Sequence, residues 1–366
     1  MQATNDTIFA TDPIELAVDV HERALADYSA GEVTQAESGF RQALALLQKS
    51  EAPDSPDVAN VLISLAAIHE HRCEYREAQG LYKRSVEIMD GTPDDGDQEV
   101  ERLRGQAWCN LGAAERILGN YDDAEARFQK ALDHAEQHFG PESIEAAGIL
   151  NHLGMLGKYA GRFTAAQSYY QRALAILEER LGTGHPELAS LYHNLGGLEH
   201  ARGEFEAGEP FARRSVERRE SALGPDHPMV AEDIAALAAL LDGQGKYAEA
   251  EALYHRALDI FRDAYGDEHY EIAVNLNNLA AIHQATGKFA EAEACYRRAL
   301  LIKEKIFAPD SVEIALTANN LAVLYKSMGR RNEAADLLGR ALVIFEAALA
   351  DDHPHLIACR ENCADF

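Results

Sequence analysis

Apolar residues recur along this chain with the three- and four-residue spacing of amphipathic helices. Residues 268–307 show the pattern: Ala292, Tyr296, Ala299 and Leu300 fall on one helical stripe. A Gly-Lys-Phe turn at 287–289 separates this stripe from the apolar stretch before it. Glycine is suited to ending a helix because it accepts the left-handed backbone conformation found there. The segment therefore predicts two amphipathic helices joined by a tight turn.

The same pattern returns with a fixed period. A glycine followed two residues later by an aromatic residue recurs every 42 residues, at Gly119, Gly161, Gly203, Gly245 and Gly287. Gly329 continues the series, and counting back places Cys73 and Gly31 in the same slot, with four extra residues in the loop-like segment 91–97. The period predicts eight helix-turn-helix units over residues 13–350.

Small residues and a constant leucine mark the first helix of these units, and an alanine marks the second. The first-helix pairs are Leu111-Gly112, Leu153-Gly154, Leu195-Gly196, Leu237-Ala238, Leu279-Ala280 and Leu321-Ala322, and the second-helix alanines are Ala124, Ala166, Ala250, Ala292 and Ala334. This pattern resembles the tetratricopeptide repeat, and its 42-residue length resembles the kinesin light chain subclass. The resemblance implies an all-α, right-handed superhelical solenoid with a concave groove lined by the first helices. It also implies a non-catalytic module that binds a partner protein or an extended peptide.

The ends of the chain depart from the repeat. We expect a disordered tail at 1–12, the eight-unit solenoid at 13–350, and a capping helix at 351–366. The Asp352-His353-Pro354 sequence is the start signal of this helix. The His227-Pro228 and His185-Pro186 pairs place proline at the predicted first position of a helix, where its missing N–H is tolerated.

Charge and composition limit the classes of partner. The 366 residues include 34 Lys and Arg against 61 Asp and Glu, for a net charge of −27, which argues against nucleic acid or an anionic membrane as a partner. The longest apolar run, 234–241, is too short to span a bilayer. The five scattered cysteines suggest a reducing compartment, and the N-terminal residues contain no basic and apolar leader, so we expect a cytoplasmic protein.

Polar side chains gather just before the constant leucine, at positions that face the groove in the family the chain resembles. These candidate peptide-binding residues are Asn110, Asn151, His152, His193, Asn194, Asn277, Asn278, Asn319 and Asn320. Asparagine is a mediocre helix former, and its amide can pair with the N–H and C=O groups of an extended peptide. The alternative is that these amides bond to the neighbouring repeat and stabilise the stack.

Two basic residues occupy the position five residues after the leucine. Arg116 and Lys158 would give one end of the groove a cationic patch suited to an acidic segment of a ligand, unless they are solvated surface residues. A second basic column lies on the second helices: Arg84, Lys130, Arg172, Arg214, Arg256, Arg298 and Arg340. We interpret this column as ordinary helix-surface pairing with acids at helix starts, such as Glu249 and Glu291.

Metal-binding and catalytic signals are weak. His134 and His138 have the spacing of a metal-binding pair, but no third ligand is close in sequence, and we interpret both as surface histidines, although a neighbouring helix could supply a ligand. A terminal set also has the right residue types for zinc: His353, His355, Cys359 and Cys363. No phosphate loop, nucleophile elbow or zinc-protease motif is present, and no cofactor is expected. An assembly scaffold or a metal-binding protein remain the alternative functions, and the sequence does not indicate an oligomeric state.

Overall fold

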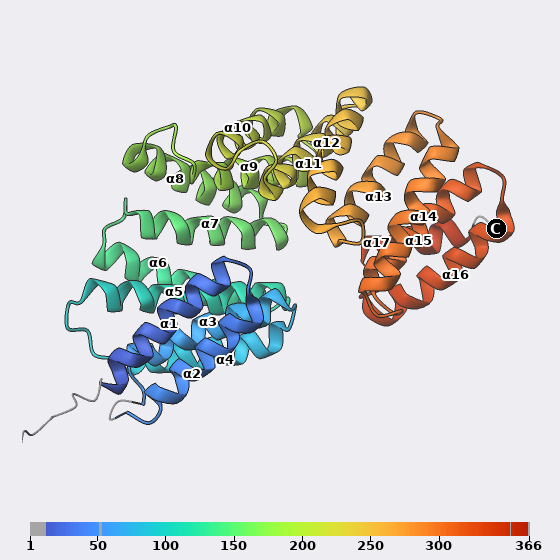
Figure 1. Cartoon of the computed structure of the whole chain (residues 1–366). Coiled ribbons are helices and arrows are strands. Elements are labelled where there is room, and N and C mark those ends of the chain that lie inside the picture. Colours follow the sequence, from blue (N-terminus) through green and yellow to red (C-terminus); the bar gives the residue numbers. More distant parts are fainter. Residues whose placement is uncertain (1–11, 51–52, 352, 365–366) are drawn as a thin grey trace, which may run out of the picture. The chain divides into compact units, whose positions relative to one another are not determined.

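The computed structural model describes residues 12–50, 53–351 and 353–364, and all regular structure within these ranges is helical. Seventeen helices are present in the described residues, and the chain divides into two compact units, Met1–Thr183 and Gly184–Phe366 (Figure 1). The first unit contains α1 (Pro13–Ser29), α2 (Val33–Leu47), α3 (Pro56–His71), α4 (Tyr75–Gly91), α5 (Gln98–Ile117), α6 (Tyr121–His138), α7 (Ile144–Tyr159) and α8 (Phe163–Leu181).

The second unit has one helix more. It contains α9 (Leu188–Arg202), α10 (Phe205–Leu223), α11 (Pro228–Gly243), α12 (Tyr247–Tyr265), α13 (Tyr270–Ala285), α14 (Phe289–Ile306), α15 (Val312–Ser327), α16 (Arg331–Ala348) and α17 (Pro354–Ala364). Each odd-numbered helix from α1 to α15 packs against the even-numbered helix that follows it. The predicted series of eight helical hairpins is therefore confirmed.

Within each unit the hairpins stack in chain order. First helices of successive hairpins contact one another. In the first unit α3 contacts α5 and α5 contacts α7, and in the second unit α9 contacts α11. The main contacts between hairpins join a second helix to the next first helix, such as α4 to α5 and α10 to α11. The first helices therefore lie together on one face of each stack.

The core of each hairpin depends on small residues that let the two helices approach closely. Gly154 on α7 faces Tyr170 on α8, and a Cβ added to Gly154 would lie 2.4 Å from the Tyr170 ring. The Tyr170 ring is fully buried, as is Phe128 at the same position of the preceding repeat. The glycine leaves the space that the aromatic ring fills, and this packing holds the hairpin together.

The turns between paired helices require a left-handed backbone. Gly31 and Gly119 have φ of 83° and 81°, and Cys73, in the same slot of the repeat between them, has φ of 60°. Cys73 is the one described non-glycine residue with a positive φ. The period therefore located the turn correctly even where its usual glycine is missing.

Replacing Cys73 by glycine is expected to raise the free energy of unfolding by up to about 1 kcal/mol, because it removes the clash of a Cβ atom in a left-handed conformation. Urea denaturation followed by circular dichroism would measure the change. The matched variant Cys73→Ala also loses the thiol but keeps the Cβ atom, and it should give no gain. Equal stability of the two variants would contradict this explanation.

Two expectations about helix ends can be compared with the structure. Helix α11 begins at Pro228 with His227 as its N-cap, as predicted. Pro186 does not begin a helix: α9 starts at Leu188, and the residues before it form a turn in which the Leu188 and Ala189 N–H groups donate to carbonyls three residues back. This tighter hydrogen-bonding pattern replaces the first turn of the expected α-helix.

The C-terminal helix α17 packs against α15 and α16, with Leu356 and Cys359 buried. Arg360 and Glu361 are exposed, as expected of a capping helix, whereas Asp365 lies outside the described residues. The predicted tail at 1–12 also lies outside them except for Asp12, whose carboxylate caps α1 by accepting the Ile14 N–H at 2.9 Å.

Candidate functional site

The strongest concentration of candidate residues lies in the first unit, on the neighbouring helices α5 and α7. A cleft of about 240 Å³ opens between α5, α6 and α7, and Asn110 and His152 line it together with apolar Ile149 and Phe139. Asn110 and His152 come from successive repeats at the position just before the constant leucine. The structure therefore brings these two predicted residues to one cleft.

The His152 side chain packs against an aromatic ring of the preceding repeat. The imidazole stacks on the Phe128 ring, with 5.3 Å between centroids and 12° between planes. Burial, together with the smaller effect of the Arg116 positive charge, lowers the pKa of His152 to about 4, so the imidazole is neutral at physiological pH. Its buried Nδ1 atom has no hydrogen-bond partner in the structure. The ring therefore carries an unused polar atom beside the cleft.

Arg116 and Lys158 both contact one aromatic ring, that of Tyr159. The Arg116 guanidinium carbon lies 5.1 Å from the centre of the Tyr159 ring, and the Lys158 ammonium nitrogen lies 5.0 Å from it. Burial and the neighbouring Arg116 charge both lower the pKa of Lys158. We call Arg116, Lys158 and Tyr159 the cationic cluster; the sequence predicted its two cations but not the tyrosine that both of them contact.

The second basic column contrasts with this cluster because its members are largely neutralised. Arg172 on α8 pairs with Glu136 on α6 at 2.7 Å, and Arg256 on α12 pairs with Glu220 on α10 at the same distance. The expected pairing is thus present, but these partners are acids near the end of the preceding second helix. The helix-start acid Glu249 instead pairs with Arg213, because acids at helix starts face a different row of basic residues.

Candidate asparagines in the second unit bond to one another across repeats. The Asn320 amide donates to the Asn277 side-chain oxygen at 3.3 Å, and Asn362 donates to Asn319 at the same distance. Asn278 hydrogen-bonds to the Tyr254 hydroxyl. Such contacts are those required by the alternative interpretation, in which the amides stabilise the stack.

The remaining candidate peptide-binding residues differ from one another in their burial and contacts. His193 Nδ1 lies 2.7 Å from the buried carboxylate of Asp233 on α11. Asn194 is buried, and both Asn194 and Asn151 interact with other groups of the protein. Asn320 also borders an open hollow of about 340 Å³ with Gln284 and Tyr296. The candidate column is therefore a set of differing local environments.

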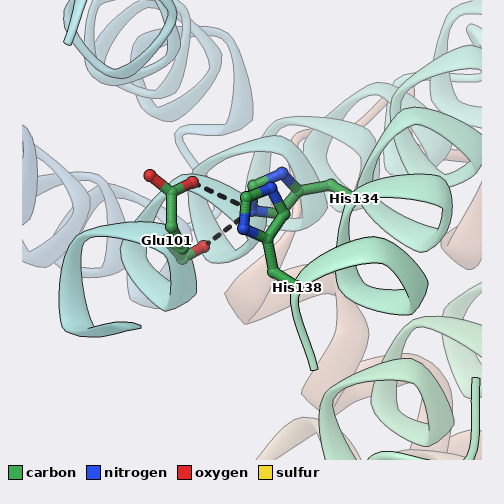
Figure 2. Close-up of side chains that lie close together, drawn as sticks. All are labelled: Glu101, His134 and His138. Carbon is green, nitrogen blue, oxygen red and sulfur yellow. Dashed lines mark hydrogen bonds and ion pairs between the residues drawn. The ribbon is translucent and has the colours of Figure 1, made fainter. Parts of the chain in front are cut away.

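The histidine pair on α6 differs from the sequence interpretation. The His134 side chain is only 11% exposed, so it is no surface histidine, and Glu101 on α5 supplies the third group that the local sequence lacked (Figure 2). The terminal residues His353, His355, Cys359 and Cys363 do not converge on a common point among the described residues. Cys359 packs in the core of the last repeat.

The repeat geometry agrees with a family comparison. The tetratricopeptide repeat profile matches residues 15–90, 103–179, 145–207, 187–263, 233–305 and 271–347. The chain belongs to the tetratricopeptide repeat family. The resemblance found in the sequence, to repeats of the kinesin light chain-like subclass, is confirmed at the level of family and fold. No curated protein sequence matches significantly.

Solved structures share the tetratricopeptide fold. BtubC (BKLC) from P. vanneervenii is 22% identical, with a TM-score of 0.50, over 67% of this chain and 92% of that chain. The apo form of RapI is 14% identical, with a TM-score of 0.58, over 79% and 98%. A Rap protein complexed with competence and sporulation factor is 16% identical, with a TM-score of 0.57, over 96% and 98%. At these identities the likeness extends to the fold alone.

One further structural finding bears on the class of protein. No helix of the described tetratricopeptide repeats combines the length and apolar character needed to cross a bilayer. The repeats assign the chain to a family of protein-protein interaction modules. Which surface serves that interaction depends on the side chains described above.

Proposed function

We propose that this protein is a non-catalytic interaction module, and that it binds an extended peptide or partner segment with acidic side chains along the first helices of its repeats. The observation that carries the proposal is the cationic cluster. Arg116 and Lys158 have no carboxylate within ion-pair distance among the residues the structure describes, although the chain contains 61 acidic residues. The Arg116 charge acts on Glu70, but the Glu70 carboxylate accepts a hydrogen bond from Tyr82 instead. The pair of Arg116 and Lys158 is suited to an acidic group from outside.

The local electrostatics favour an anion at this position. Arg116 and Lys158 place two positive charges against one ring, and their mutual repulsion contributes to the lowered pKa of Lys158. The Arg116 Nε atom is buried and has no hydrogen-bond partner in the structure. A carboxylate would relieve the repulsion and accept this N–H, and charge-assisted bonds of this kind are among the stronger ones in proteins.

The neighbouring residues extend the proposed site along α5 and α7. Asn110 and His152 line the adjacent cleft, and the Arg116 charge acts on the His152 ring, so the cleft and the cationic cluster are close enough to contact one ligand. The amide of Asn110 offers both a donor and an acceptor to a peptide backbone. The Rap protein complexed with competence and sporulation factor is an example of this fold holding a partner.

The proposal predicts charge-dependent peptide capture. We would select binders from two matched peptide libraries, one rich in glutamate and one with glutamine in its place. Wild-type protein should favour the glutamate library, and Arg116→Glu/Lys158→Glu should weaken the selected peptides by about tenfold or more, because each charge-assisted bond contributes roughly 1.5–3 kcal/mol. Fluorescence anisotropy at low and high salt would measure the affinities.

A matched control separates this site from general charge effects. Arg162→Glu/Arg172→Glu changes the net charge equally, but its two arginines already pair with Glu125 and Glu136. This control should retain most of the binding. Equal losses in both double variants, or no glutamate preference, would contradict the proposal and favour the assembly scaffold, which the amide contacts of Asn277 with Asn320 also support.

A further inference from the structure

Three potential metal ligands meet in the first unit, and two of them, Glu101 and His134, line the same cleft as Asn110 and His152. Glu101 on α5 and His134 and His138 on α6 offer ligand atoms that all lie within 4.8 Å of one another, and we call them the Glu101–His134–His138 cluster. Figure 2 shows the two imidazoles, one turn apart on a single helix, beside a carboxylate that comes from the facing helix. The His134 Nε2 atom lies 3.2 Å from Glu101 Oε2.

The other repeats provide an internal reference for this position. The slot of His134 holds a buried isoleucine in five other repeats: Ile88, Ile176, Ile260, Ile302 and Ile344. The slot of Glu101 holds residues before or at the start of a first helix elsewhere, such as Ser143 and Ser311. Helix α5 begins early, at Gln98, and so carries Glu101 inside the helix. Two changes in one repeat thus place a carboxylate against an imidazole.

Burying a carboxylate and an imidazole costs stability unless they are paired. Arg104 supplies part of this pairing, since its Nε donates to Glu101 Oε2 at 2.8 Å and its Nη2 to Glu101 Oε1 at 3.2 Å. The His134 Nε2 also lies 3.2 Å from the Glu101 backbone oxygen. These contacts account for Glu101, Arg104 and His134 as a polar network, but they do not involve His138.

His138 adds a third potential metal ligand beside this polar network. Its ring lies 4.3 Å from the His134 ring, centroid to centroid, and its Nε2 is 3.9 Å from an Asp94 carboxylate oxygen. Asp94 belongs to the loop between α4 and α5 that interrupts the 42-residue period. The three ligand groups of the cluster therefore come from two helices, and a carboxylate from the inserted loop adjoins one of them, His138.

We propose that the Glu101–His134–His138 cluster binds one Zn²⁺ ion, with water or Asp94 as a fourth ligand. Two histidines and one glutamate form a known zinc ligand set, and two histidines four residues apart on a helix can reach one ion. With bonds of about 2.0–2.1 Å, tetrahedral ligand atoms are about 3.3 Å apart, close to the His134–Glu101 separation. The wider separations in the cluster, up to 4.8 Å, involve His138, and they close by rotation of its side chain, which is 21% exposed.

The surroundings of the cluster support a dication. Glu101 Oε2 has a second lone pair for the ion while Arg104 stays on the same carboxylate, and outer contacts of this kind orient metal ligands. The Asp94 carboxylate beside His138 adds negative charge next to the cluster. Bound Zn²⁺ would fasten α5 to α6 in the repeat where the period is broken.

The sole tryptophan of the chain provides a local probe. The Trp108 ring lies 5.1 Å from the His134 ring in an edge-on arrangement. We would strip the full-length protein with a chelator, titrate it with ZnCl₂, and follow both calorimetry and Trp108 fluorescence. We expect one ion per chain, accompanied by a change in fluorescence.

Two variants test the ligand assignment. His134→Ile restores the residue of the other repeats, and His138→Gln leaves the buried network intact; each should weaken Zn²⁺ binding on the order of 100-fold or more while the helical content stays unchanged. His185→Ala and Cys73→Ala, which remove other potential zinc ligands, should bind as wild type does. Absence of stoichiometric binding in the wild type, or wild-type affinity in either cluster variant, would overturn the proposal.

Discussion

Replacing Tyr170 by alanine is expected to lower the free energy of unfolding of the first unit by about 3–5 kcal/mol, the usual cost of removing a large aromatic ring from a core. The Tyr170 ring is 0% exposed and fills the space left by Gly154 on the facing helix. Glycine has no side chain that could move into the cavity. Because the helix backbones cannot easily approach further, the cavity should persist.

The matched variant Tyr170→Phe keeps the ring and removes only the hydroxyl. That hydroxyl is buried and has no hydrogen-bond partner in the structure, so its loss should leave the stability unchanged or slightly higher. Urea denaturation followed by Trp108 fluorescence measures both variants, since this tryptophan lies in the same unit. A loss of stability in Tyr170→Phe similar to that in Tyr170→Ala would show that ring packing is not the main contribution.

Replacing Asp233 by isoleucine should destabilise the second unit by about 3–5 kcal/mol, because it leaves a largely buried arginine without its partner. Asp233 is 1% exposed, and its carboxylate accepts the Arg219 Nε–H at 2.6 Å and contacts His193 at 2.7 Å. The Arg219 side chain is only 11% exposed. His193 is more exposed, so water can replace its lost contact.

A double-mutant cycle tests whether this cost comes from the isolated charge. The repeat two steps earlier places Ile149 and Ala135 at the two positions of Asp233 and Arg219, so the fold accepts an apolar pair there. Asp233→Ile/Arg219→Leu should recover most of the stability lost in Asp233→Ile. Thermal unfolding by circular dichroism would measure the series. A double variant as unstable as the single one would refute the argument.

The sequence by itself determined the architecture of this protein. The 42-residue step located each helical turn, including the one at Cys73, whose φ is positive although it is no glycine. The small residue after each constant leucine indicated the tetratricopeptide repeat, and at Gly154 this residue lies at the close contact between paired helices. These features were readable because each follows from local backbone conformation and helical periodicity, and every repeat presents them again.

Only the tertiary structure decided which side chains become partners. Arg116 and Lys158 were visible in the sequence, but the contact of Arg116 with Tyr159 depends on the register between α5 and α7. The pairing of Asn277 with Asn320 depends likewise on the stacking of successive first helices. Periodicity assigns a residue to a helix face but does not specify the distance to a side chain on another helix.

The Glu101–His134–His138 cluster shows the same limit most clearly. His134 and His138 were recognised as a pair from their spacing, whereas Glu101 is 33 residues from His134 in the sequence and lies on another helix. The position of Glu101 beside His134 depends on the early start of α5 after the loop that breaks the period. Such a departure has no counterpart in the other repeats, so the repeat pattern could not predict it; the packing of α5 against α6 places the carboxylate beside the imidazole.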